Sequence, residues 1–151
     1  MEIAPLPDAL RADAVALWRA AGLVRPWNDP EADLRRAMAG PESVVLAALD
    51  GGRLLATAMV GHDGHRGWVY YLAVAEDARG RGLARRLMDA CEAWVRERGI
   101  AKIQLMVRAD NREVAAFYEH LGYERSDVVV LGRRLDGSRA GATGRSAGRG
   151  V

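Results

Sequence analysis

In the first half of the chain, apolar residues recur first at helical and then at strand spacing. Apolar positions follow one another every three or four residues over 8–21, which predicts an amphipathic helix. Asp29 is a suitable N-cap, and Pro30 a suitable first residue, for a short second helix that ends near Ala39. Three runs of β-branched and aliphatic residues follow, at Ser43–Leu49, Arg53–Gly61 and Trp68–Ala75. Glycine-containing turns separate them, so we expect three strands that pair antiparallel in series.

Helices and strands alternate in the second half of the chain. Gly80–Arg98 has its apolar residues on one face and is predicted to be a long helix, and Ile103–Val107 is predicted to be a strand. Asp110 and Glu113 have capping-box spacing at the start of a further helix, and Val128–Leu135 is predicted to be a last strand. The long helix can serve as a crossover between parallel strands. The sequence therefore predicts an α/β (α+β) domain with a mixed sheet and helices packed on it.

Length and composition favour one ordinary globular domain. The chain has 151 residues, of which 50% are hydrophobic and 28% charged. No apolar run approaches the roughly 18 residues of a membrane span. The first residues have neither the basic start nor the apolar stretch of a signal peptide, so we predict a cytoplasmic protein without a membrane partner.

Charge and cysteine content exclude several other classes of protein. The formal net charge is +2. It lies in residues 136–151, a Gly/Ser/Arg-rich stretch that we expect to be a flexible tail after a domain of residues 1–135. We therefore predict no nucleic-acid partner, because a nucleic-acid-binding domain clusters its basic residues on a folded face. Cys91 is the single cysteine, which excludes an internal disulfide and a multi-cysteine metal site, and we expect it to be an inert core thiol.

The most informative segment is the loop between the third strand and the long helix. It contains Gly80 and Gly82, which let the backbone approach a ligand closely, and three arginines at 79, 81 and 85. The free N–H groups at the start of a helix, together with its dipole, form an anion site. The loop is therefore expected to bind a pyrophosphate.

Two other interpretations of this loop remain open. A dinucleotide-binding fingerprint has Gly-x-Gly-x-x-Gly/Ala after the first strand of a parallel unit, whereas Arg85 stands at the third position here and the preceding strands resemble hairpins. A purely structural glycine loop with surface arginines is the second alternative.

The loop and two neighbouring segments resemble a known family. Arg79–Ala84 matches the Arg/Gln-x-x-Gly-x-Gly/Ala signature of the GNAT superfamily, the GCN5-related N-acetyltransferases. The strand Tyr70–Val74 precedes it, and Asn111 followed by Ala115–Tyr123 resembles the second signature of the family. The resemblance covers nearly all of residues 1–135.

This resemblance implies a fold of about six to seven strands and about four helices, in which two parallel strands splay apart. The segments Arg25–Pro30 and Gly61–Gly67 look closest to the bacterial YpeA-like subgroup. The splayed strands are here expected to be Trp68–Ala75 and Lys102–Val107, with acetyl-CoA between them and no metal. The residues expected to bind acetyl-CoA are Leu72, Ala73 and Val74 at the pantetheine, Arg79, Gly80, Arg81, Gly82, Leu83, Ala84 and Arg85 at the pyrophosphate, and Asn111 on the other side.

The resemblance also implies direct attack of an amine on a thioester. A backbone N–H near Val74 would stabilise the acetyl oxygen. Tyr118 matches the position of the general acid of the family, and its alternative role is that of a half-buried helix tyrosine that packs on the sheet. Relatives that acetylate ribosomal-protein N-termini have a glutamate where this chain has Met106, whose thioether accepts no proton. The base is then a water chain, or one of His62, Asp63 and His65, which are also ordinary turn residues.

The acceptor pocket is expected beside the loop that joins the first two helices. Trp27 and Asn28 lie in this loop, where Trp27 either lines the pocket or plugs the helix pair. Tyr70 and Tyr71 are expected on opposite faces of the sheet, with one of them facing the acceptor. His62 and His65 are further candidates for contact with the acceptor.

The resemblance to the GNAT superfamily therefore implies an acetyl-CoA-dependent N-acetyltransferase, with a primary amine on a small molecule, peptide or protein as acceptor. A protein N-terminal or lysine acetyltransferase is the first alternative, and a non-catalytic acyl-CoA sensor is the second. We expect a monomer or a homodimer.

Overall fold

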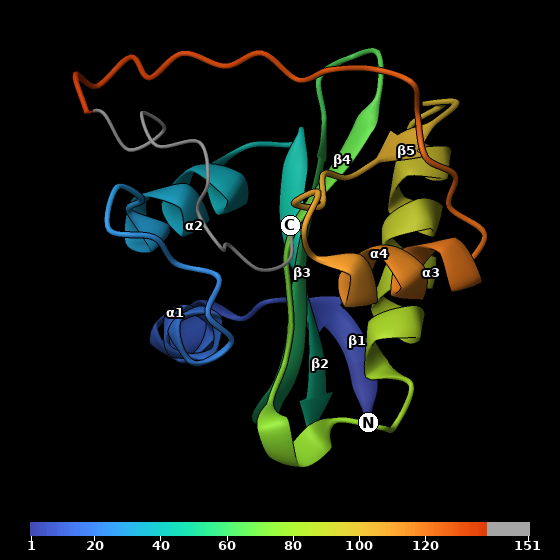
Figure 1. Ribbon diagram of the computed structural model, residues 1–151. Coiled ribbons are helices and arrows are strands. Elements are labelled where there is room, and N and C mark those ends of the chain that lie inside the picture. The colour runs from blue at the N-terminus through green and yellow to red at the C-terminus, as the bar shows by residue number, and fades with distance from the viewer. Residues whose placement is uncertain (139–151) are drawn as a thin grey trace.

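The computed structural model describes residues 1–138 as a sheet with helices on both faces (Figure 1). The strands are β1 (Glu2–Pro5), β2 (Ser43–Asp50), β3 (Arg53–His62), β4 (Gly67–Val74) and β5 (Ile103–Gln104). The α-helices are α1 (Arg11–Ala20), α2 (Pro30–Ala39), α3 (Leu83–Glu97) and α4 (Arg112–His120), and short 3-10 turns lie at Asp8–Leu10 and Glu76–Ala78. The remainder of the expected tail, residues 139–151, lies outside the described residues.

The five strands lie in the order β1-β2-β3-β4-β5. Neighbours are antiparallel from β1 to β4, and β4 and β5 are parallel. The predicted antiparallel series and the crossover through α3 are therefore confirmed. β1 was not predicted, because Glu2–Pro5 is short and ends in a proline. It becomes a strand by pairing with β2.

Each face of the sheet has its own apolar core. Figure 1 shows α1 and α2 on one face and α3 and α4 on the other. Under α1 and α2, Trp18 and Leu34 are buried against the sheet. Under α3 and α4, Leu87, Met88 and Cys91 are buried. No helix among residues 1–138 is long and apolar enough to cross a membrane.

Helix starts follow local chemistry, with two differences from prediction. Asp29 caps α2 as expected, since Ala32 N–H donates to its carboxylate at 3.0 Å. The cap of α4 is Asn111 rather than Asp110, because Val114 N–H donates to Asn111 Oδ1 at 3.3 Å. The helix α3 begins at Leu83 and not at Gly80, because Gly80 and Gly82 both take positive φ.

The largest difference from the sequence prediction lies after α4. The described chain has five strands, fewer than the six to seven expected: Val128–Leu135 forms none, and β5 ends at Gln104. The apolar side chains of this segment are 66% to 92% exposed, and Figure 1 shows it crossing the end of the sheet from the α4 side toward the α2 side. Strand propensity acts through packing against a partner strand, and β5 is too short to provide a long ladder.

Gly67 allows α3 to pack closely on β4. A Cβ at this position would lie 2.6 Å and 2.8 Å from the two γ-methyl groups of Val95. We expect Gly67→Ala to lower the free energy of unfolding by about 1–3 kcal/mol through overpacking, which thermal unfolding measures. Adding Val95→Ala should recover part of this loss, since the two side chains share one contact. Gly132→Ala, which meets nothing within 4 Å, is the control, and equal melting temperatures for Gly67→Ala and wild type would contradict the account.

Candidate active site

β4 and β5 pair over a short length and then separate. Their register contains only Gly67 with Ile103 and Trp68 with Gln104. β4 continues to Val74, whereas β5 ends at Gln104. The side of β4 that faces β5 is therefore unpaired along most of its length, and an extended ligand can bind to such a backbone as an added strand.

A β-bulge lies in the unpaired part of β4. The register with β3 shifts between Thr57 and Met59, so that Tyr71 and Leu72 together oppose Ala58. Tyr71 has φ 52°, and within residues 1–138 it is the single residue other than glycine with positive φ. Such strained backbone persists only where surrounding contacts hold it, and it is common at functional sites.

The bulge places Tyr70 and Tyr71 on the same face of the sheet, so the prediction of opposite faces was wrong. Tyr70 pairs with Met59, whose side chain packs into the core under α1 and α2, and Tyr71 is buried in that core. The strict alternation that the prediction assumed fails because the bulge adds one residue to β4. Tyr70 is 37% exposed and stays available to a ligand.

Tyr71 is fixed at both its ring and its hydroxyl. Its ring stacks on Trp18 with centroids 3.9 Å apart, and its hydroxyl donates to Asp33 Oδ2 at 2.7 Å. Burial, and next the hydrogen bond to Asp33, raise the pKa of Tyr71, so the phenol is neutral at physiological pH. A role for Asp33 could not be predicted from local pattern, because its partner Tyr71 lies 38 residues away in the sequence.

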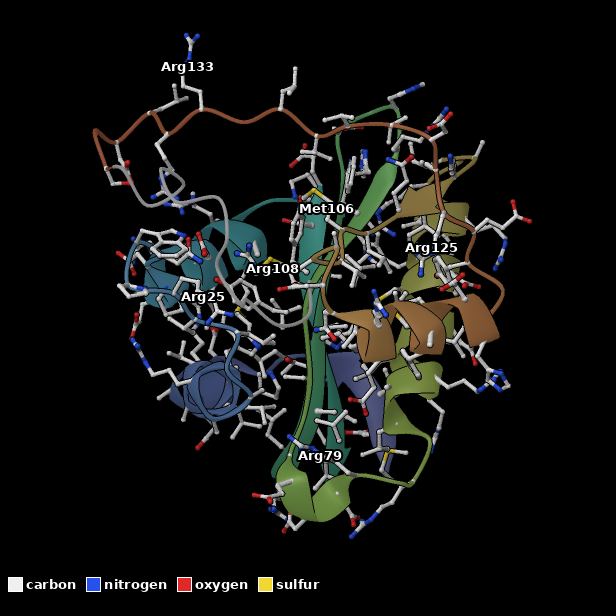
Figure 2. All side chains as sticks on the ribbon, viewed as in Figure 1. Arg25, Arg79, Met106, Arg108, Arg125 and Arg133 are labelled. Atoms are coloured by element: carbon white, nitrogen blue, oxygen red, sulfur yellow. The ribbon has the colours of Figure 1, made fainter. Side chains whose placement is uncertain are left out.

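The glycine-arginine loop leads into α3 at Gly82. Gly82 is the N-cap with φ 73°, no side chain caps the helix, and its first turn holds no acidic residue. Arg79, Arg81 and Arg85 are exposed around it, and Figure 2 shows Arg79 at the end of the sheet where the chain enters this loop. The first N–H groups of α3 therefore point into a positively charged surface.

The Asn111 side chain has one satisfied and one unsatisfied end. Its Oδ1 accepts the N–H of Val114, which identifies the other atom as the amide nitrogen Nδ2. This nitrogen is buried and has no hydrogen-bond partner among the described residues. Because an unpaired buried donor is costly, it marks a place where a ligand acceptor fits.

Tyr118 is 4% exposed on α4, with its ring edge-on to Phe117 and Tyr123. Burial, and next the neighbouring Cys91, raise the pKa of Tyr118 above its ordinary value, so the phenol is protonated at neutral pH. Its hydroxyl makes no hydrogen bond to residues 1–138. Burial also raises the pKa of the Cys91 thiol to about 12, which keeps it neutral.

The turn that contains His62 and His65 lies by the other end of α3. His62 lines a surface hollow of about 560 Å³ with Pro41, Glu42, Glu97 and Arg98. The glycine-arginine loop lies at the start of α3, whose length is about 22 Å at 1.5 Å per residue. The structure therefore does not bring His62 to the glycine-arginine loop before α3.

Asp63 organises this turn rather than accepting protons. The N–H groups of Arg66 and His65 donate to its Oδ1 at 2.8 Å and 2.9 Å, and Trp68 Nε1 donates to its Oδ2 at 3.2 Å. These bonds, led by the one from Arg66, lower the pKa of Asp63 to about 2. His65 is exposed beside it. Within residues 1–138 no group of three or more acidic, histidine or cysteine side chains is placed to hold a metal ion.

The loop between α1 and α2 contains the other predicted acceptor residues. Trp27 and Asn28 are half-buried, and Trp27 belongs to neither apolar core of the described residues. Its carbonyl accepts a hydrogen bond from Arg134 Nη2 at 2.8 Å, which ties the segment after α4 to this loop. In the view of Figure 2, Arg108 extends toward α2 from the segment after β5, and Met106 lies nearer the end of the sheet.

Comparison with known proteins identifies the family and the fold. Residues 11–123 match the Acetyltransferase (GNAT) family. The aminoglycoside antibiotic 6'-N-acetyltransferase AAC(6')-IG from Acinetobacter haemolyticus is 21% identical, with a TM-score of 0.72 over 90% of this chain and 100% of that one. AAC(6')-Iy, in complex with a bisubstrate analogue of CoA, is 17% identical, with a TM-score of 0.75 over 88% and 97%.

A third solved structure widens the set of similar proteins. A transcriptional regulator from Bacillus halodurans is 17% identical, with a TM-score of 0.76 over 88% of this chain and 99% of that one. These identities establish the shared mixed α/β fold. The family match spans more than half of the chain. The protein is therefore a member of the Acetyltransferase (GNAT) family, whose enzymes use acetyl-CoA as acetyl donor.

Proposed function

We propose that this enzyme transfers the acetyl group of acetyl-CoA to a primary amine by direct attack within a ternary complex. The observation that carries the proposal is the separation of β4 from β5 along a strand that contains a strained bulge, together with the unpaired amide nitrogen of Asn111 at the N-cap of α4. A strand-like ligand with amide groups, such as the pantetheine arm, matches both features.

The residues present suit acetyl-CoA along its length. The backbone of Leu72, Ala73 and Val74 would bind the pantetheine arm as an added strand, and Asn111 Nδ2 would donate to it from the other side. The amides of residues 80–85, with the arginines around them, would bind the pyrophosphate. The free N–H groups and the absence of acidic residues in the first turn of α3 support this assignment.

Leu72 N–H is the best-supported donor to the acetyl oxygen. The Tyr71 carbonyl accepts a hydrogen bond from Thr57 on β3, at 3.1 Å. The C=O and N–H groups of one trans peptide point in opposite directions, and residues 1–138 contain no cis peptide. The Leu72 N–H therefore points away from Thr57, toward the side on which β4 and β5 separate. A fixed N–H aimed at developing negative charge lowers the barrier to acyl transfer.

Tyr118 is proposed to protonate the leaving sulfur. Bound acetyl-CoA supplies the chemistry, in which an N–C bond forms to the acetyl carbon as the C–S bond breaks. Of the two protons that the ammonium loses, one reaches the sulfur through the Tyr118 hydroxyl and the other leaves to solvent. A protonated phenol with a free hydroxyl suits this role.

The proton acceptor is proposed to be a chain of water molecules. Met106 occupies the place where N-terminal acetyltransferases have a glutamate, and its thioether is not a base. Asp63, with its pKa near 2 and three hydrogen bonds, accepts protons poorly. Exposed Tyr70 lies on β4 beside the bulge, where solvent has access.

A small molecule with a primary amine is our preferred acceptor. Aminoglycosides enter the first screen because the similar solved structures AAC(6')-IG and AAC(6')-Iy are aminoglycoside acetyltransferases. Trp27, Asn28, Tyr70, His62 and His65 remain proposed acceptor contacts. Tyr70 has the most direct support, because it is 37% exposed and directly precedes the bulge residue Tyr71.

Three finer assignments accompany this proposal. The segments Arg25–Pro30 and Gly61–Gly67 support membership of the YpeA-like subgroup. We propose that residues 1–135 form the catalytic domain, followed by a tail. We also propose that the enzyme acts in the cytoplasm as a monomer or homodimer, without a nucleic-acid or membrane partner.

Thiol release from acetyl-CoA tests this activity against the alternatives. The panel contains aminoglycosides, polyamines, peptides with free N-termini and lysine peptides. Release with small amines supports the proposal, and release with peptides alone favours a protein acetyltransferase. Tight binding of acetyl-CoA with no release across the panel would favour an acyl-CoA sensor.

Asn111→Asp removes the proposed donor to the pantetheine arm and puts a carboxylate oxygen in its place. Aspartate keeps the oxygen that caps α4, so the fold should be retained. We expect acetyl-CoA affinity to fall by at least about 10-fold in calorimetric titration, because one buried hydrogen bond is lost and the new carboxylate repels the ligand acceptor. Asp110→Asn, at the exposed neighbour, should leave the affinity unchanged. Unchanged affinity in Asn111→Asp would contradict the assignment.

A further inference from the structure

We propose that Thr57 and Trp18 form a hydrogen-bond relay that holds the β4 bulge and thereby aims the Leu72 N–H at the acetyl oxygen. Both are positioning residues, since neither side chain would touch the substrate. This inference rests on the proposed function, because it explains how the donor of that reaction is oriented.

Thr57 is the one buried polar side chain among the described residues, with 0% exposure. It lies on β3 within an otherwise apolar stretch and faces the core under α1 and α2. Trp18 Nε1 donates to its Oγ1 at 2.8 Å, and Oγ1 in turn donates to the Tyr71 carbonyl at 3.1 Å.

The chemistry of the two partners sets the direction of the relay. An indole N–H is a donor only, and a carbonyl is an acceptor only. The Thr57 hydroxyl must therefore accept from Trp18 and donate to Tyr71. The hydroxyl proton of Thr57 therefore points to the Tyr71 carbonyl, and this hydrogen bond holds the carbonyl on the side of β3.

The relay acts on the peptide group between Tyr71 and Leu72, whose orientation sets the direction of the proposed donor. The Tyr71 carbonyl and the Leu72 N–H belong to the same plane, so fixing one fixes the other. Tyr71 has positive φ, a conformation that a tyrosine leaves readily unless its surroundings hold it.

Trp18 holds the same bulge a second time through its ring. The indole stacks on the Tyr71 ring at 3.9 Å and 12°, and the hydroxyl of Tyr71 is bound by Asp33 on α2. Trp18 is fully buried, so one side chain of α1 fixes both the carbonyl and the ring of Tyr71. This arrangement goes beyond what packing of an apolar core requires, since an apolar residue at 57 would fill the same space.

The test compares Thr57→Val, Thr57→Ser and wild type with acetyl-CoA labelled with ¹³C at the acetyl carbonyl. Valine keeps the shape and removes both hydrogen bonds, whereas serine keeps the hydroxyl. Infrared spectroscopy reports the carbonyl stretch of the bound thioester, which a hydrogen bond lowers. Titrations with acetyl-CoA and with CoA separate the acetyl contact from the remaining contacts.

We expect the stretch to be lowered in wild type and in Thr57→Ser, and to return toward the free value in Thr57→Val. Acetyl-CoA affinity should fall about fivefold in Thr57→Val, the scale of one hydrogen bond, with CoA affinity within twofold of wild type. Val45→Ala, which opens a cavity in the same core, should lower the melting temperature and leave the carbonyl stretch of the bound thioester unchanged.

Trp18→Phe provides a second variant if Thr57→Val does not fold. It keeps an aromatic ring on Tyr71 and frees the Thr57 hydroxyl to rotate, so a partial return of the stretch is expected. An equally lowered stretch in wild type and in the folded relay variants would overturn the relay and leave the proposed function intact. Wild type that binds acetyl-CoA without a lowered stretch overturns both the Leu72 donor and the relay, and wild type that does not bind it overturns the proposed function itself.

Discussion

Tyr118→Phe should lower turnover roughly 10²- to 10⁴-fold with any amine that the enzyme accepts, the usual range for loss of a general acid. The phenylalanine ring keeps the edge contacts with Phe117 and Tyr123, so α4 should stay in place. The hydroxyl makes no hydrogen bond to the described residues, and its loss leaves no partner unsatisfied. The change therefore removes the proton donor and little else.

Thiol release measures this loss, and calorimetric titration measures acetyl-CoA affinity, which should stay within about twofold of wild type. Tyr123→Phe is the matched control, because the Tyr123 hydroxyl donates to Glu92 at 2.7 Å and takes no part in the proposed reaction. It should cost stability and preserve turnover. A parallel loss of turnover and acetyl-CoA affinity in Tyr118→Phe would show a structural role for the tyrosine in place of a catalytic one.

The pH profile gives a second view of Tyr118. Burial raises its pKa above the ordinary value of 10.0, so the acid form is present throughout the physiological range. Loss of activity by ionisation of Tyr118 should therefore appear only above about pH 10. A decrease in activity with rising pH below pH 10 would report the ionisation of another group.

Gly82→Asp should abolish detectable binding of acetyl-CoA. The new carboxylate would stand at the N-terminal end of α3, where the pyrophosphate is proposed to bind, and two like charges would share one site. Aspartate tolerates positive φ better than most residues, and a Cβ at Gly82 meets nothing within 4 Å. The fold should therefore survive the change.

Two companion variants separate charge from backbone strain. Gly82→Asn has nearly the same shape without the charge and should weaken binding much less. Gly51→Asp, with φ 55° in the turn between β2 and β3, introduces a similar strain away from the loop and should bind normally. The anion-site assignment would be wrong if Gly82→Asp retained the acetyl-CoA affinity of wild type.

Sequence patterns predicted the elements whose signals are local. Asp29 and Pro30 gave the start of α2, because a cap and a proline act within one turn of helix. Gly80 and Gly82 predicted the loop before α3 in the same way, since positive φ is a property of single residues. The roles of Asn111 and Tyr118 came from resemblance to a family.

The bulge and the relay were not predictable, because they depend on distant partners. Tyr71 has strong strand propensity, and nothing in its neighbours indicates a positive φ. The bulge arises from the pairing of β4 with β3. The hydrogen bond that is proposed to hold it joins Trp18 to Thr57, which are 39 residues apart in the sequence. One signal was available, since Thr57 is the lone polar residue in the apolar stretch Leu54–Val60.

The expected last strand failed for a related reason. Val128–Leu135 has the composition of a strand, but composition does not provide a partner, and this segment instead reaches the α1–α2 loop, where Arg134 binds the Trp27 carbonyl. The segment and the loop thus lie together on the side proposed for the acceptor.

The central claim is that the separated strands and the loop before α3 bind acetyl-CoA. Thermal unfolding of the wild-type protein with acetyl-CoA, CoA and NAD in parallel tests it most directly. A ligand at 100 times its dissociation constant adds about 2.7 kcal/mol to the free energy of unfolding. The account predicts this stabilisation with acetyl-CoA and CoA and none with NAD, whereas no response to millimolar acetyl-CoA would contradict it.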